Sequence, residues 1–244
     1  MTISPNIPYA PWLTSLPSDW KADRLKDIVP RIVGGGTPSS SNPDFWEDGN
    51  IVWVTPTDFS SAEGIDVIAD SERKITVAGL QSSSAVLVPK GAVIMASRAT
   101  IGSVRIAATE LATNQGFISF VCDDRILHHR FLYYVIEGFL GDYFAEIAPR
   151  TTFAEISRGS AKQEPIGFPK LDEQLLITRY LDFCCNAIDA VGPRRAFSQR
   201  TLLGADAISR QINTLTAYRK SLIHECVTGQ RRITESDTSN LMLP

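Results

Sequence analysis

The 244-residue sequence has no uninterrupted apolar stretch of the roughly 18 to 20 residues that a membrane-spanning helix needs. Its first residues, MTISPNIPYAPW, also lack the basic start and apolar run of a secretory signal peptide. We therefore expect a cytoplasmic protein with no membrane partner. Hydrophobic residues make up 43% of the chain and charged residues 21%, a balance typical of globular proteins rather than disordered ones.

Cysteine and histidine are too few and too badly spaced to form a familiar metal site. The four cysteines, Cys122, Cys184, Cys185 and Cys226, form no CxxC pair, so we expect small buried thiols rather than a disulfide framework. His128 and His129 are adjacent and His224 is distant, which gives neither HExxH nor a Cys/His zinc spacing. The sequence therefore predicts no metal and no cofactor.

The usual nucleophile and phosphate motifs are also absent. The glycine-rich segment GGGTPSSS at residues 34–41 lacks the Gly-Lys-Ser/Thr that completes a P-loop, so we interpret it as an exposed, flexible turn. Ser97 and Ser103 lie outside any GxSxG elbow. No catalytic residues are predicted from these patterns.

Two partial motifs leave an enzymatic alternative open. The NPDF segment at residues 42–45 resembles the NPP(Y/F) tetrad of adenine methyltransferases, but its second proline is missing. Asp44, Glu72 and Lys74 fit a loose PD…ExK nuclease pattern, in which carboxylates hold Mg²⁺. Such spaced patterns arise often by chance, so we interpret these residues as a turn and a charged strand end. A self-contained Mg²⁺-dependent nuclease remains the alternative function.

Short β-type runs dominate the first half of the chain. They are rich in β-branched or aromatic residues and lie at residues 51–54, 85–88, 92–95, 103–106 and 116–120. Residues 128–147 differ, because Phe131, Val135 and Phe139 recur at four-residue steps, which predicts a buried helix. Residues 165–169 should be extended, because a residue before proline avoids the α region. We therefore expect a mainly β domain with one packed helix over residues 1–170.

Two long helices should follow this domain. Asp172 is the expected N-cap of the first helix, which stops at Gly192-Pro193, and the second ends at Gly229. Helices of about 20 and 35 residues extend about 30 and 50 Å, more than a domain of this size needs for its own core. The predicted fold class is α+β, with a coiled-coil-like arm over residues 171–232 and a flexible tail over residues 233–244. Apolar positions at coiled-coil spacing suggest a dimer seam formed by Leu181, Ile188, Leu202, Ile208, Ile212, Leu215 and Leu222.

Charge is distributed unevenly along the chain. The net charge is −3 and the pI about 5.7, whereas nucleic-acid binders usually show a basic footprint. Residues 193–232, however, contain eight basic residues opposed only by Asp206 and Glu225. The arm is therefore expected to be locally cationic.

An ordered series of segments resembles one known family across nearly the whole chain. In the domain these segments are LPSDW (16–20), RL (24–25), GTP (36–38), FW (45–46), IVWVTPTD (51–58), RKIT (73–76), GL (79–80), SRATIG (97–102) and TNQGF (113–117). In the arm they are DEQ (172–174), LD (181–182), ID (188–189), YRKSLI (218–223) and VTG (227–229). In this order they resemble the specificity (S) subunits of type I restriction-modification systems.

The resemblance implies recognition without catalysis. Methylation and cleavage in such systems belong to separate methyltransferase (M) and restriction (R) subunits, which become the expected partners. Family members usually carry two recognition domains, whereas this chain carries one, so it resembles a half-subunit whose homodimer would read a bipartite, palindromic site on double-stranded DNA. Residues 167–172 read GFPKLD where relatives commonly have a double proline. A non-DNA dimerisation scaffold is a further alternative.

Polar residues in the expected loops are the candidates for DNA contact. They are Thr37, Ser39, Ser40, Thr57, Lys74, Arg98, Asn114, Gln115, Arg150, Thr151 and Thr152. The last three combine a cation with hydroxyls directly after the predicted helix and are the strongest local candidates. Arg98 could instead pair with an internal carboxylate, and Asn114 and Gln115 could stabilise a tight turn. The cationic arm could be solvated surface, a cover over the DNA between half-sites, or a dock for an acidic methyltransferase subunit.

Overall fold

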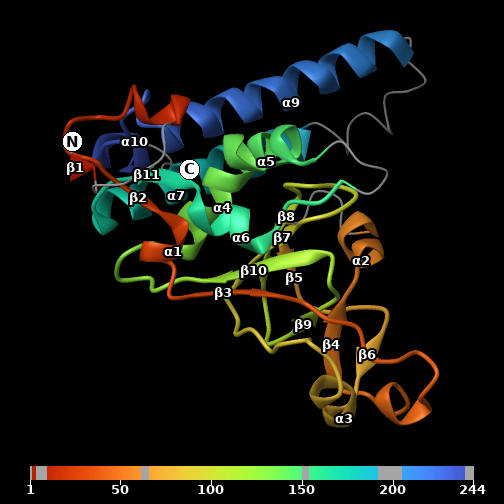
Figure 1. Ribbon diagram of the computed structural model, residues 1–244. Helices are drawn as coiled ribbons and strands as arrows, with labels where there is room; N and C mark the ends of the chain where they lie inside the picture. The colour runs from red at the N-terminus through yellow and green to blue at the C-terminus, as the bar shows by residue number, and fades with distance from the viewer. Residues whose placement is uncertain (1, 4–9, 62–65, 150–153, 192–204, 240–244) are drawn as a thin grey trace.

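The computed structural model describes residues 2–3, 10–61, 66–149, 154–191 and 205–239 (Figure 1). Within these residues the fold is α+β, as expected, with three β-sheets and a pair of long helices. The helices α4 and α5 lie between the long helix α9 and the largest sheet (Figure 1). None of the described helices is long and apolar enough to span a membrane.

The largest sheet forms the centre of the domain. Its strand order is β3 (Arg31–Gly34), β10 (Phe117–Val121), β7 (Val93–Ala96), β8 (Val104–Ala107) and β5 (Val67–Ile68). All residues of β7 are buried, which fits its uniformly apolar sequence VIMA in the middle of the sheet. The predicted runs at residues 92–95, 103–106 and 116–120 are each confirmed as strands with a shift of one residue.

Two smaller sheets flank this centre. One contains β6 (Lys74–Ile75), β4 (Ile51–Val54) and β9 (Ala112–Thr113), and the other β1 (Thr2–Ile3), β2 (Lys21–Arg24) and β11 (Pro165–Phe168). The prediction of a strand at residues 85–88 is wrong, because only Val88 forms an isolated bridge, to Leu111. Short helices connect these strands: η1 (Pro11–Leu13), α1 (Leu25–Ile28), η2 (Pro43–Phe45), α2 (Pro56–Ser61), α3 (Val77–Gln81) and α6 (Arg158–Gln163).

The predicted helix at residues 128–147 is present but irregular. It consists of α4 (His129–Val135), the π-helical turn η3 (Ile136–Leu140) and α5 (Gly141–Ile147). Gly138 in the π turn faces α9 so closely that a Cβ there would lie 2.9 Å from Cγ2 of Ile223. Glycine therefore permits the close packing of this helix against the arm.

The arm consists of α7 (Leu171–Val191) and α9 (Ala205–Val227). Helix α7 begins at Leu171, so Asp172 lies in its first turn and the prediction that it is the N-cap is wrong by two positions. Gly229, with φ of 74°, follows the end of α9 as expected of a C-terminal glycine. The two helices pack on each other, and α9 also packs on α4 and η3.

Residues 233–239 are ordered against the domain, in contrast to the flexible tail expected there. Ile233 is only 5% exposed and belongs to the main core, and the short helix α10 (Glu235–Ser239) packs on α7. Residues 240–244 lie outside the described residues.

Candidate nucleic-acid interface

Four loops meet at one edge of the domain. Gly34 at the end of β3 pairs with Ile118, and Ala96 at the end of β7 pairs with Phe117, so both strands end where β10 begins. Strands β4 and β9 run parallel, with Trp53 opposite Ala112, and therefore also end side by side.

Backbone hydrogen bonds join these loops to one another. Gly36 N–H donates to Thr113 O at 2.9 Å, Asn114 N–H donates to Val54 O at 2.9 Å, and Ser97 N–H donates to Gly116 O at 2.8 Å. At Gly35 a Cβ would lie 1.9 Å from the carbonyl oxygen of Asn114, which only glycine avoids. We call this surface the recognition edge and define it as residues 35–41, 55–58, 97–102 and 114–116.

Thr37 and Gln115 form the centre of the recognition edge. Both are exposed, and the Thr37 hydroxyl donates a hydrogen bond to Oε1 of Gln115, 78 positions further along the chain. Asn114 stabilises a tight turn, as the sequence analysis considered, because its Oδ1 accepts a hydrogen bond from Gly116 N–H at 2.8 Å. The fold thus brings together candidates that the sequence placed in separate loops.

Asp58, next to Thr57, anchors the start of α2 and is a residue that the sequence analysis did not select. The buried carboxylate of Asp58 accepts hydrogen bonds from the N–H and hydroxyl of Thr55, at 2.7 and 2.6 Å, and from Glu72 N–H at 2.8 Å. Thr57 itself is exposed on α2. The Thr-x-x-Asp spacing at a helix start was the signal available in the sequence.

Arg98 is exposed at the recognition edge but paired with an internal carboxylate. Its guanidinium lies 2.9 Å from Glu155, its side chain is 45% exposed, and the two residues form an isolated β-bridge. The next residue, Ala99, has a φ of 57°, a conformation that non-glycine residues rarely adopt. The ion pair considered for Arg98 is confirmed, and it holds this cation at the surface.

Trp46 fixes the serine loop at residues 39–41 through a hydrogen bond. Ser39 bonds to Ser41 through their hydroxyls at 2.8 Å, and its carbonyl accepts a hydrogen bond from Trp46 Nε1 at 2.9 Å. Ser40 is exposed in the same loop. The guanidinium of Arg73 lies 3.8 Å from the centroid of the Trp46 ring, which adds an exposed cation that the sequence analysis did not select.

Of the remaining four candidates, the structure describes only Lys74. Lys74 lies in β6 and pairs with Asp70 at 3.2 Å. Arg150, Thr151 and Thr152 lie outside the described residues.

The structure gives the nuclease alternative no support. Asn42 Oδ1 caps the short helix η2 by accepting from Asp44 N–H at 3.1 Å, so the NPDF segment is a capped turn. Among the described residues, the one group of three metal-binding side chains is elsewhere and includes neither Asp44 nor Glu72.

The expectation of a cationic arm needs correction. Arg219 pairs with Glu137 at 2.8 Å, Lys220 pairs with Asp142, and Arg232 pairs with Asp19 at 2.8 Å. Because these acids come from the domain, intrachain pairs neutralise much of the described positive charge. Arg210 is exposed, Arg231 lies over the ring of Tyr180, and Arg194, Arg195 and Arg200 lie outside the described residues.

Two residues of the expected dimer seam belong to the chain's own core. Leu181 is 0% exposed and Leu222 is 2% exposed, and both pack in the main hydrophobic cluster, so neither is available to a second copy. Ile188, Ile212 and Leu215 are half-exposed on the arm. Leu202 and the side chain of Ile208 lie outside the described residues.

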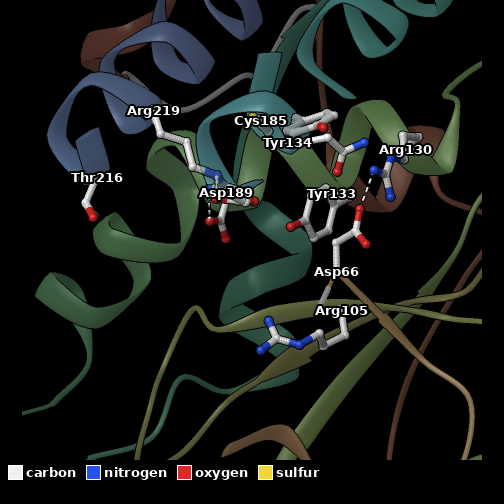
Figure 2. Close-up of a pocket in the computed structure, with 11 residues that line it drawn as sticks. Asp66, Arg105, Arg130, Tyr133, Tyr134, Cys185, Asp189, Thr216 and Arg219 are labelled. Carbon is white, nitrogen blue, oxygen red and sulfur yellow. Dashed lines mark hydrogen bonds and ion pairs between the residues drawn. The ribbon is translucent and has the colours of Figure 1, made fainter. Parts of the chain in front are cut away.

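A polar joint connects the domain to the arm (Figure 2). Arg130 on α4 pairs with Asp66 before β5, as Figure 2 shows. It also pairs with Asp182 on α7 at 2.6 Å. Burial lowers the pKa of Arg130, but its hydrogen bond to Asp182 and the nearby negative charges outweigh burial and raise the pKa overall. Arg130 and Asp66 line a cavity of about 270 Å³ together with Arg105, Tyr133 and Arg219.

The described residues form a domain with a polar edge built from loops and a helical arm that packs on this domain. The sequence matches the type I restriction modification DNA specificity domain over residues 17–191, and the chain belongs to this family. Members of this family are DNA recognition components and not enzymes, in agreement with the expectation from sequence.

Two curated relatives share this similarity. The MjaIX specificity subunit of Methanocaldococcus jannaschii is 34% identical over 71% of this chain and 40% of its own length. The EcoR124I/EcoR124II specificity subunit of Escherichia coli is 30% identical over 67% of this chain and 40% of its own. The chain thus spans less than half the length of these relatives.

Solved structures show the same fold. A chain from a study of complex assembly and conformational transition of the type I R-M system gives a TM-score of 0.60 at 20% identity, covering 92% of this chain and 49% of that one. The HsdS subunit from Thermoanaerobacter tengcongensis gives a TM-score of 0.56 at 20% identity, and the match covers 89% of this chain and 47% of that subunit.

Proposed function

We propose that the recognition edge reads one half of a bipartite DNA site, and that the arm holds two such domains at a fixed spacing. The observation that carries this proposal is the convergence of four separate loops on one rigid edge, with Thr37, Thr57, Arg98 and Gln115 exposed along it. Hydroxyls, amides and arginines are the side chains that read base edges and bind phosphates.

The arm supports a dimer of two half-length chains. Ile212 and Leu215 are half-exposed on α9, although they lie at the coiled-coil positions of this helix. A second copy would cover them and give a two-fold symmetric reader, which predicts a palindromic target. In this proposal the dimer directs separate methyltransferase and restriction subunits to double-stranded DNA.

The decisive experiment is co-purification of the chain with a type I methyltransferase subunit, followed by sequencing of the methylated sites. We expect a bipartite motif with two equivalent halves. Gln115→Ala should change the preferred bases or weaken specific binding about tenfold, because a good bidentate base contact contributes about 1–3 kcal/mol.

The matched control is Gln163→Ala, the same change at an exposed position on α6, away from the recognition edge. Equal effects of the two variants would contradict a reading role for the recognition edge. If the chain dimerises without binding DNA in any complex, the scaffold alternative replaces the proposal.

A further inference from the structure

Asp124, His128 and His129 form a compact cluster of metal-binding side chains between β10 and α4. One ligand atom of each lies within 4.8 Å of the others. The cluster lies outside the recognition edge, and nothing in DNA reading requires it.

The geometry of Asp124 and His129 suits a shared ion. His129 Nδ1 lies 2.9 Å from each carboxylate oxygen of Asp124. Two ligand atoms at this separation subtend an angle of about 90° at an ion about 2.0–2.1 Å from each, which a metal tolerates. The imidazole rings of His128 and His129 have centroids 4.6 Å apart and so lie on the same side of the chain.

The backbone holds both histidines in place. His129 N–H donates to Asp124 Oδ1 at 2.8 Å, and His128 N–H donates to Oε1 of Gln174 at 2.8 Å. Because Gln174 comes from α7, the first helix of the arm helps to position the cluster. The ligands are therefore largely preorganised before any ion binds.

The side chain of His128 lacks one hydrogen bond. Its Nδ1 atom is buried and has no hydrogen-bond partner among the described residues. A buried ring nitrogen without a partner costs free energy, which a bound ion or an ion-bound water would recover.

We propose that Asp124, His128 and His129 bind one divalent transition-metal ion of the Zn²⁺ class. Two imidazoles and one carboxylate match the ligand preference of zinc better than that of Mg²⁺ or Ca²⁺, which favour oxygen. Because two ligands of one ion lie at most about 4.2 Å apart, the cluster must contract by about half an ångström. Asp124 is exposed, so water can complete the coordination.

The ion would stiffen the junction between the domain and the arm. Besides the contact to His128, Gln174 Nε2 donates to the carbonyls of Ile126 and Pro169, each at 3.0 Å. An ion that binds only the folded cluster stabilises this junction by mass action. This inference is independent of the proposed DNA recognition.

The test is a titration of the full-length chain with ZnCl₂ by isothermal calorimetry, and with CoCl₂ by visible absorption. We expect one ion per chain and a Zn²⁺-dependent rise in Tm. Asp124→Asn and His129→Gln should each weaken binding at least tenfold. The matched controls are Asp123→Asn, one residue away and paired with Arg125, and His224→Gln on α9, and both should bind as the original chain does.

Two results would overturn the proposal. One is the absence of stoichiometric binding to the original chain. The other is unchanged binding by a His128→Ala, His129→Ala double variant, which would place the ion elsewhere. Should these variants fail to fold, imidazole NMR of the original chain decides: Zn²⁺ must shift the His128 and His129 signals and leave His224 unchanged.

Discussion

At the scale of single residues, Arg130 pairs with two carboxylates in the polar joint between the domain and the arm. Its side chain is 18% exposed and contacts Asp66 and Asp182, while Tyr134 also donates to Asp182 at 2.6 Å. Arg130→Met removes the cation and leaves the partly buried carboxylates of Asp66 and Asp182 without their ion-pair partner. We expect the free energy of unfolding to fall by about 2 kcal/mol, below the value for a fully buried pair because Asp182 is partly solvated.

Urea unfolding followed by circular dichroism measures this effect, with Arg125→Met as the matched control. Arg125 also pairs with a carboxylate, that of Asp123, but its side chain is 88% exposed. The control should leave the urea midpoint unchanged. Similar shifts in both variants would mean that Arg130 contributes no more than a surface pair.

Arg232 makes stability depend on pH. Its hydrogen bond lowers the pKa of Asp19 to about 2, whereas burial raises the pKa of Glu173, an effect that the charge of Arg232 opposes. The stabilisation from Asp19 is present above its ordinary pKa of 3.8 and is lost as pH falls through about 2. Without Arg232 the pKa of Glu173 should rise further. The ionised form of Glu173 at neutral pH would then destabilise the folded state more than it does beside Arg232.

The effects on Asp19 and on Glu173 both lower the free energy of unfolding of Arg232→Ala at neutral pH. The variant should lower the urea midpoint clearly at pH 7 and much less near pH 2, where Glu173 is protonated and Asp19 becomes protonated even beside Arg232. Arg210→Ala, at an exposed position on α9, is the control and should show no such dependence. A loss that is equal at both pH values would exclude the ion pairs as its cause.

At the scale of elements, the π turn η3 depends on Gly138. A Cβ at this position would lie 2.9 Å from Cγ2 of Ile223 and 3.3 Å from Cγ2 of Val227. Gly138→Ala should therefore push α9 away and destabilise the fold by about 1–3 kcal/mol, the usual cost of overpacking. Thermal unfolding measures this change.

Gly159→Ala is the matched control for that prediction. A Cβ at Gly159 would meet only Ser157 Oγ, at 3.5 Å, and the residue is exposed in α6. Alanine should be neutral or stabilising there, by up to about 1 kcal/mol, because it favours helix over glycine. A Tm for Gly138→Ala as high as for Gly159→Ala would show that the arm does not pack this tightly.

Elements with strong local patterns could be predicted from the sequence, and contacts between distant segments could not. The strand β4 was predicted with its observed bounds and the start of α7 to within two residues, because alternation and helical periodicity are local signals. Residues 85–88 have the composition of a strand, yet only Val88 pairs, because partners depend on the tertiary arrangement.

In the candidate site, too, contacts between distant segments could not be predicted from the sequence. Hydroxyls and amides in loops suggested Thr37 and Gln115, but only the sheet register shows that they touch. The spacing of Leu181 and Leu222 suggested a seam with a second copy, although the domain itself covers both. Periodicity identifies an apolar face and does not specify what covers it.

At the scale of the whole molecule, the arm should set the distance between two half-sites. Helices α7 and α9 pack side by side, so one turn of four residues must be added to both, after Asp189 and before Arg210. Each added turn lengthens the arm by about 6 Å, which corresponds to roughly 2 base pairs of DNA. We therefore expect the spacer in the methylated motif to lengthen while the half-site sequences stay the same.

Sequencing of methylated DNA measures the spacer directly. The control replaces exposed Gln211 and Asn213 by alanine without a change in length, and its spacer should match that of the original chain. An unchanged spacer in the insertion variant, with methylation intact, would show that another contact sets the spacing. A changed half-site would instead mean that the arm also affects how the recognition edge meets DNA.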